Sequence, residues 1–258
     1  MGSEMCIRDR HFTADSWSYT EDGYLMFSGT GALDEMYVMT LSDVKEYAAL
    51  RVEPLDEACR EWNEKALLPV GYECNNLFLT DWDETDFGEL DFYDLFDVFY
   101  PQIYHRKIPW QSGKNAGNST VYEIPSKEFE SVVQKFLNVK TDILRKKTIY
   151  REKDDTYEYY PRGFYESEYP EHPYPEVTAF QENDDGTVTL TVHAVFPYLG
   201  SSRALVHEVT VRPMENAAAA VRYVSNKIIS SLDDPDDNWY VPRLSREERS
   251  LLYEENTD

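Results

Sequence analysis

Apolar residues at helical spacing predict two amphipathic helices. They recur at i, i+3, i+4 and i+7 in residues 55–66, which follow a proline, and in residues 129–137, which follow Pro125-Ser126. This spacing gives a helix one apolar face, and a proline at or just before the first turn is typical of a helix start. In the first segment, Glu61 and Lys65 add a favourable i,i+4 pair.

A third helix is expected over residues 90–100, where four apolar residues share one stripe. Asp91, Asp94 and Asp97 line a second stripe of the same segment. We expect this helix to stop at Pro101, because proline lacks the backbone N–H that a helix interior needs.

Two shorter helices complete the helical pattern. Residues 141–147 should begin with Thr141 as the cap and end in three cations, which complement the helix dipole. Ser245 and Glu248 fit a capping box, in which each side chain accepts a hydrogen bond from the other residue's backbone N–H. A short C-terminal helix should start there.

Alternation of apolar and polar residues predicts a series of strands in the second half. They cover residues 148–152, 156–160, 177–181, 187–196, 204–212 and 221–225. Earlier strands are expected at residues 24–27, 36–41 and 75–80, with a turn at residues 28–31. Asp185-Gly186 is a tight-turn signal between two of the later strands.

These elements predict an α+β fold with helices packed on a curved antiparallel sheet. We divide the chain into an N-terminal α+β region (11–106), a polar loop (107–120), a helix followed by an antiparallel meander (121–230), and an acidic loop with a short helix (231–258). The order of helix and meander in 121–230 is similar to cystatin-like or nuclear-transport-factor-like rolls, an analogy of fold that carries no function.

Residues 1–10 are left out of this fold prediction because they resemble a sequencing artefact. Met5 to Arg10 back-translates into a sequence that resembles a transposase-end sequencing adapter. We therefore expect native sequence to begin near His11, and any signal peptide or lipid anchor to have been encoded upstream.

The charge of the chain narrows the classes of partner. Its net charge is −24, and 41% of its residues are hydrophobic. Such a negative field repels phosphate backbones and anionic lipid, so we expect no nucleic-acid ligand and no membrane contact except through a missing N-terminal lipid anchor. The apolar content is high enough for a folded core.

Cysteine leaves two alternatives open. Apart from Cys6, which lies in the suspect first ten residues, only Cys59 and Cys74 are present. They could form a disulfide that closes a loop of about 15 residues, or remain two reduced thiols. Neither belongs to a CxxC pair, which argues against thiol-redox and zinc-ribbon proteins.

His193 and His207 lie on consecutive predicted strands and could suggest a zinc pair. Matching the apolar face of residues 187–196 to that of residues 204–212 aligns Val192 with His207. The two imidazoles then point to opposite faces, because side chains alternate along a strand. We interpret His207 as a hydrogen-bonded core histidine and expect no zinc pair.

The acidic stretch of residues 81–97 does not fit a known metal loop. An EF-hand that started at Asp81 would place Phe92 at position 12, where a glutamate is required. The chain also lacks the common nucleophile, zinc-protease and phosphate-loop motifs. We therefore assign no catalytic residue, no metal ligand and no cofactor from the sequence.

The best binding candidate is an aromatic segment, residues 161–175, with four prolines and three glutamates. Long loops in compact domains are often functional, and tyrosine provides rigid contact area at low entropic cost. The candidate ligand-binding residues are Phe164, Tyr165, Tyr169 and Tyr174. The alternative is that these rings pack the segment onto the sheet.

Four motifs resemble a known family: residues 50–55 (LRVEPL), 75–78 (NNLF), 90–96 (LDFYDLF) and 223–226 (YVSN). Together they resemble an uncharacterised bacterial cell-envelope family of lipoproteins of unknown function, over most of residues 12–230. The resemblance implies an exported, lipid-anchored protein on the outer face of the membrane, and transfers no catalytic residue.

Two classes of function remain open. The first, which we favour, is a non-catalytic envelope module that binds a peptide, a glycan or another protein. The second is a hydrolase that acts on cell-wall sugar through carboxylates. A buried acid with a raised pKa in a cleft would favour the hydrolase, and an exposed aromatic patch without such an acid would favour the binding module.

Overall fold

The computed structural model divides the chain into two units, residues 1–52 and 53–258. In the second unit it describes residues 56–109, 121–163, 166, 172–196, 201–215, 219–231 and 240–254. Residues 253 and 254 are described by backbone alone. In the first unit it describes the backbone of four strands.

The first unit is a four-stranded antiparallel sheet in chain order. Its strands are β1 (Glu4–Ile7), β2 (Arg10–Tyr19), β3 (Tyr24–Gly31) and β4 (Tyr37–Thr40). The strands expected at residues 24–27 and 36–41 are confirmed. The turn expected at residues 28–31 is wrong, because β3 continues through both glycines and pairs Gly29 with Ala14 and Gly31 with Phe12.

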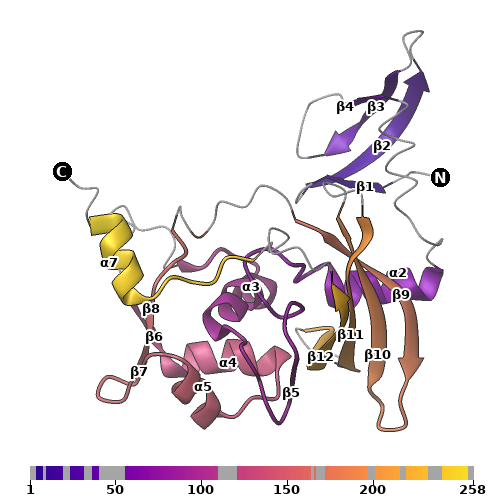
Figure 1. The fold of residues 1–258 in the computed structure, drawn as a ribbon. Helices are drawn as coiled ribbons and strands as arrows, with labels where there is room; N and C mark the ends of the chain where they lie inside the picture. The colour runs from indigo at the N-terminus through magenta and orange to yellow at the C-terminus, as the bar shows by residue number, and fades with distance from the viewer. Residues whose placement is uncertain are drawn as a thin grey trace. The chain divides into compact units, whose positions relative to one another are not determined.

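A five-stranded antiparallel sheet dominates the second unit, in the order β5-β12-β11-β10-β9. Its strands are β5 (Trp82–Asp83), β9 (Tyr174–Glu182), β10 (Val188–Phe196), β11 (Ser201–Pro213) and β12 (Val221–Ser231). The predicted meander is confirmed for β9 to β12 (Figure 1), whereas the strands expected at residues 148–152 and 156–160 lie in a separate sheet. Gly186, with φ of +77°, forms the expected turn between β9 and β10.

Helices and a smaller sheet complete an α+β fold. The helices are α2 (Glu57–Trp62), which continues into the π-helical segment η1 (Asn63–Leu67), α3 (Phe92–Tyr104), α4 (Ser126–Phe136), α5 (Thr141–Lys147) and α7 (Arg246–Glu254). The smaller sheet pairs β6 (Tyr122–Pro125), β8 (Thr156–Tyr159) and β7 (Tyr150–Arg151), in that order. No helix in the described part of the chain is long and apolar enough to cross a membrane.

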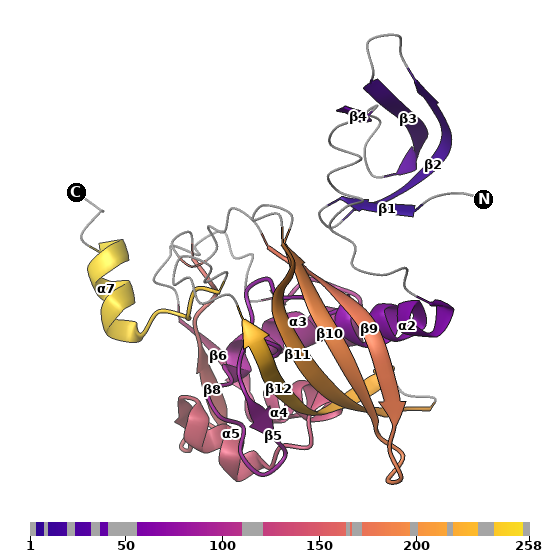
Figure 2. The ribbon, with the colours of Figure 1, turned by 45° about the vertical axis from the view of Figure 1, so that its right-hand side comes forward.

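Aromatic rings fill the space between helices α3 and α4 and strand β12. The Phe99 ring stacks on Phe136 at 4.1 Å and on Tyr223 at 6.2 Å, and Phe96 stacks on Phe129 at 5.0 Å. All five rings are buried. Figures 1 and 2 show both helices on one face of the large sheet, so this aromatic layer joins sheet and helices into one core.

Helix α3 extends further than the sequence predicts. It passes through Pro101 and ends at Tyr104, with His105 as a left-handed cap whose N–H donates to the Pro101 carbonyl at 2.8 Å. Pro101 lies near the last turn, where a missing N–H removes a single backbone hydrogen bond. Burial of Phe99 and Tyr100 outweighs that loss.

The strand expected at residues 75–80 is also wrong. The Asn75 amide donates to the carbonyls of Val70, Gly71 and Glu73, and its Oδ1 accepts from the Leu77 N–H. An asparagine that satisfies the local backbone in this way replaces a strand ladder with turns.

Of the two predicted helix caps, the one at Thr141 is wrong and the one at Ser245 is confirmed. Thr141 does not cap α5, because Lys140 occupies the cap position and the Thr141 hydroxyl donates to Glu130. The capping box before α7 is confirmed: Ser245 N–H donates to Glu248 at 2.8 Å, and Glu248 N–H donates to the Ser245 hydroxyl at 3.3 Å.

Gly88 allows a close approach within the acidic stretch, and we expect Gly88→Ala to be destabilising. Its φ is +48°, and a Cβ there would lie 2.6 Å from the carbonyl oxygen of Asp81. Left-handed strain alone costs about 1–2 kcal/mol, and the clash adds to it. Gly186→Ala is the control, since its added Cβ meets nothing within 4 Å. Urea unfolding should show the larger loss for Gly88→Ala; equal losses would contradict the clash.

Candidate functional site

The structure describes the aromatic segment in part. Phe164, Tyr165 and Tyr169 lie outside the described residues. Tyr174 is half-buried, begins β9 and pairs with Val195 of β10. One end of the segment therefore continues directly into the large sheet.

The other end of the segment is fixed by Glu166, whose side chain is fully buried. Its carboxylate accepts from the N–H groups of Gly163 and Leu244, both at 2.9 Å, and from Arg249 Nη2 at 2.6 Å to each oxygen. Leu244 and Arg249 belong to the C-terminal part of the chain. Glu166 thus ties the aromatic segment to the start of α7.

Arg162 ties the same end to helix α3. Its Nε and Nη2 donate to the two oxygens of Asp94 at 2.9 and 2.6 Å, a bidentate pair. The guanidinium also donates to the carbonyls of Glu166 and Val241. Since the Arg162 and Asp94 side chains are 7% and 0% exposed, this ion pair is almost entirely shielded from water.

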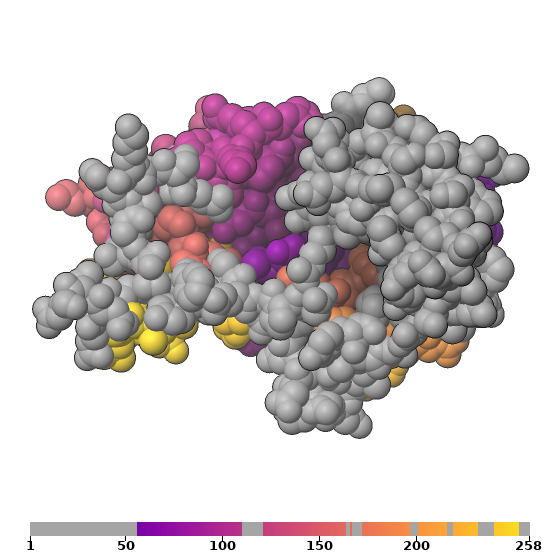
Figure 3. Space-filling model, turned by 90° about the horizontal axis from the view of Figure 1, so that it is seen from above, coloured from indigo at the N-terminus to yellow at the C-terminus, as the bar shows by residue number. Residues whose placement is uncertain are grey.

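A second arginine binds the same aspartate from the C-terminal segment. Arg243 donates to Asp94 at 2.7 Å and to Asp97 at 2.6 Å, and the Tyr240 hydroxyl donates to Asp94 at 2.7 Å. Asp97 also accepts from Tyr159 of β8. We call the buried set the charge cluster: Asp94, Asp97, Arg162, Glu166, Arg243 and Arg249. Figure 3 shows yellow C-terminal residues on the same face as the salmon residues near 160.

Burial shifts the pKa of several groups here. It raises the pKa of Asp97 despite Arg243 and the Tyr159 hydroxyl, which both lower it. It also raises the pKa of Asp91, the cap of α3, to about 6, and the neighbouring Asp94 adds to that rise. Burial alone would lower the pKa of Arg243, but the surrounding carboxylates hold it well above the usual range.

The cluster has little capacity for acid–base chemistry. The two oxygens of Asp94 accept hydrogen bonds from five donors. A carboxylate has only about four lone-pair sites, so none is left for a substrate. Neither Asp91 nor Asp97 lines the open pocket of about 410 Å³ found in the described residues, which is built around Phe136 and Tyr223. The cluster instead holds three parts of the chain together: residues 162–166, helix α3 and the C-terminal segment.

Comparison with known proteins gives one match. A family of unknown function, DUF6070, matches residues 3–243. The chain belongs to this family. No curated protein and no solved structure matches it. The lipoprotein character, the roll analogy and the adapter origin of the first residues of this DUF6070 protein stay predictions.

The predicted register of the histidine strands is confirmed in the DUF6070 chain. Val192 pairs with His207 and His193 with Val206, which places the two imidazoles on opposite faces. His207 is fully buried and hydrogen-bonds to Tyr72 at 2.8 Å and Asn226 at 2.7 Å. It is the core histidine that the sequence predicts.

The acidic stretch of this family member forms turns. Asp83 accepts from the N–H groups of Thr85 and Asp86, and Asp86 accepts from Gly88. Within the described residues no group of three or more His, Cys, Asp or Glu could hold a metal ion. Cys59 and Cys74 are free thiols, which decides between the two cysteine alternatives in this structure.

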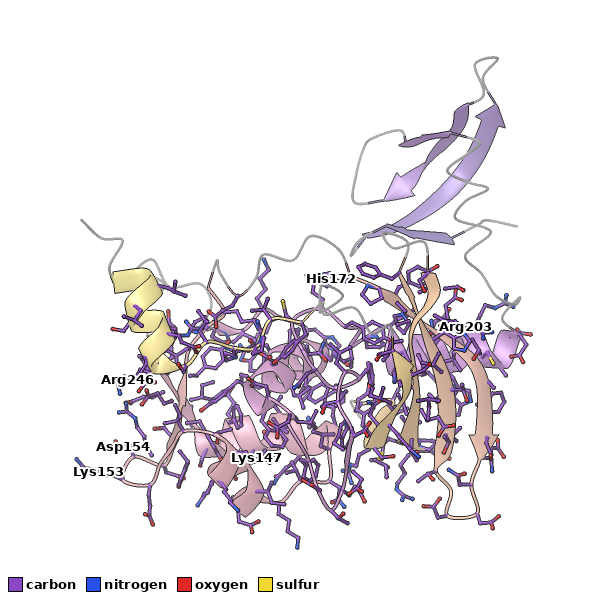
Figure 4. The ribbon with its side chains drawn as sticks, in the orientation of Figure 1. Lys147, Lys153, Asp154, His172, Arg203 and Arg246 are labelled. Carbon is purple, nitrogen blue, oxygen red and sulfur yellow. The ribbon has the colours of Figure 1, made fainter. Side chains whose placement is uncertain are left out.

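Two arginines near α5 pair with glutamates, and one lysine there binds a backbone carbonyl. Arg145 pairs with Glu130 at 3.2 Å, and Arg151 pairs with Glu123 at 3.1 Å. Lys147, labelled in Figure 4, donates to the carbonyl of Gly88. These pairings agree with a role in balancing charge within an acidic DUF6070 protein.

Proposed function

We propose that this DUF6070 protein is a non-catalytic binding module of the bacterial cell envelope. It would be exported, tethered by a lipid anchor encoded upstream of His11, and would hold a peptide, glycan or protein ligand on residues 161–175. The observation that carries the proposal is the fixed base of this segment, where Arg162 and Glu166 bind both α3 and the C-terminal segment.

A braced segment suits recognition because binding then orders fewer residues. Contact residues supported by packed and hydrogen-bonded neighbours keep their geometry, and preorganisation lowers the entropic cost of association. Here one end is held by buried ion pairs and the other by the pairing of Tyr174 with Val195. In the sequence, Phe164 and Tyr165 lie between Arg162 and Glu166, and Tyr169 lies between Glu166 and Tyr174.

The occupied carboxylates of the charge cluster favour binding over hydrolysis. A general acid or base needs an oxygen within hydrogen-bond reach of the reacting group. Donors of the chain itself already bind both oxygens of Asp94 and of Glu166. Their arrangement supports positioning of the segment.

The contact residues are tested by Tyr165→Ala and Tyr169→Ala. We expect each variant to keep its melting temperature and to lose affinity for the ligand by about tenfold or more, since a stacked ring contributes up to a few kcal/mol. Soluble cell-wall glycan fragments and a short-peptide library are the probes, read by calorimetry. Tyr104→Ala, an exposed ring on α3, is the matched control. A large fall in melting temperature would show that these rings are core.

The envelope assignment has its own test. The genomic sequence across the 5′ end should encode an apolar signal segment with a cleavage-site cysteine upstream of His11. A start codon without such a segment would contradict export and leave the binding proposal to the calorimetry.

A further inference from the structure

A pocket of about 410 Å³ opens between η1, the end of α3 and the start of β12. Phe136, Val221 and Tyr223 form an apolar floor, each at most 3% exposed. Glu64, Lys65 and His105 are exposed and form part of a polar rim. An apolar floor with a few polar groups is typical of small-molecule sites, and the volume lies toward the small end of their range.

The rim residues lie on two irregular parts of the backbone, the π-helical segment η1 and the left-handed residue His105. Glu64 and Lys65 lie on η1, where the Leu68 N–H donates to the Asn63 carbonyl at 2.9 Å, a bond that spans five residues. His105 is left-handed, with φ of +50°. π-Helical turns frequently mark functional sites, and strained non-glycine residues cluster at ligand sites. Both irregular parts of the backbone line the same pocket.

The rim offers both signs of charge. Lys65 lies 3.9 Å from Glu61 in an exposed pair, which a ligand carboxylate could replace at little cost because such pairs are weak. Glu64 provides a carboxylate one residue away. A net anion would be repelled by a chain of charge −24, whereas a zwitterion would not.

We infer that this pocket binds a short peptide with free termini and an apolar side chain. The ligand carboxylate faces Lys65 and His105, its ammonium group faces Glu64, and its side chain contacts the exposed Pro69 and Ala220 above the buried floor. The inference does not depend on the proposed function, since none of the lining residues belongs to the aromatic segment.

The test is a calorimetric and NMR titration of the whole protein with the dipeptide leucylphenylalanine. Its N-acetylated amide, which has neither terminal charge, should bind at least about tenfold more weakly. Absence of binding by the dipeptide at millimolar concentration would overturn the inference, and so would equal affinity for the blocked peptide.

Variants locate the site. Ala220 is an exposed lining residue, so Ala220→Trp should fill the pocket without overpacking the core and weaken binding by about tenfold or more. Lys65→Gln should weaken it as well, whereas Lys127→Gln, an exposed lysine on α4, should not. Unchanged affinity in Ala220→Trp, with native NMR spectra, would place the peptide elsewhere and overturn the assignment.

Discussion

Replacement of Asp94 by alanine should lower the free energy of unfolding by about 3–5 kcal/mol. The Asp94 side chain is fully buried, and it neutralises Arg162 and Arg243. Without it two guanidinium groups remain in the interior, with Asp97 as the remaining carboxylate partner of Arg243. An uncompensated buried charge is among the most costly changes that a single substitution can make.

The same variant should release the C-terminal segment. Tyr240 and Arg243 both donate to Asp94, so trypsin should cleave after Arg243 faster than in the parent protein. Urea unfolding and limited proteolysis measure the two effects. Tyr240→Phe removes one hydrogen bond and should cost about 1 kcal/mol.

A control at an exposed ion pair separates burial from charge. Glu61→Ala breaks the pair with Lys65, whose side chains are more than half exposed, and should change stability by less than about 1 kcal/mol. If Asp94→Ala lowers the free energy of unfolding no more than Glu61→Ala does, the charge cluster does not hold residues 162–166 to α3 and the C-terminal segment.

Most of the fold could be predicted because its signals are local. Alternation over residues 187–196 and 204–212 determined both strands and their register, since a slip by one residue would expose every core valine. Helix α4 was predictable from its apolar stripe alone. At Pro101 and residues 75–80 the predictions failed because the burial of Phe99 and Tyr100 and the hydrogen bonds of the Asn75 amide decide the local structure.

The charge cluster could not be predicted in the same way. The spacing of Asp94 and Asp97 is visible in the sequence, but Arg243 lies 149 residues after Asp94 and Arg162 lies 68 residues after it. No pattern within one helix indicates which of many acids will be buried. Glu166 was visible as one of three glutamates in the aromatic segment, but its partner Arg249 lies 83 residues further along the chain.

A second large effect is expected from pH, through His207. Burial lowers the pKa of this imidazole from 6.5 to about 4, against the hydrogen bond to Asn226, which raises it. Between these two values the unfolded chain binds a proton that the folded chain does not. The contribution of His207 to stability should therefore fall as the pH drops from 6.5 to about 4, by about 3 kcal/mol in total, and stay constant below that.

His207→Gln isolates this contribution, because glutamine can still accept from Tyr72 and donate to Asn226 but does not titrate. Asp91 acts in the opposite direction: its raised pKa of about 6 makes the folded state gain stability as the pH falls from 6 toward 4. The parent protein and His207→Gln both contain Asp91, so its contribution cancels when their stabilities are subtracted. Urea unfolding from about pH 7 to about pH 4 should show the parent losing about 3 kcal/mol more than His207→Gln. Parallel curves would mean that His207 is protonated in the folded protein, and the neutral Tyr72–His207–Asn226 chain would then be wrong.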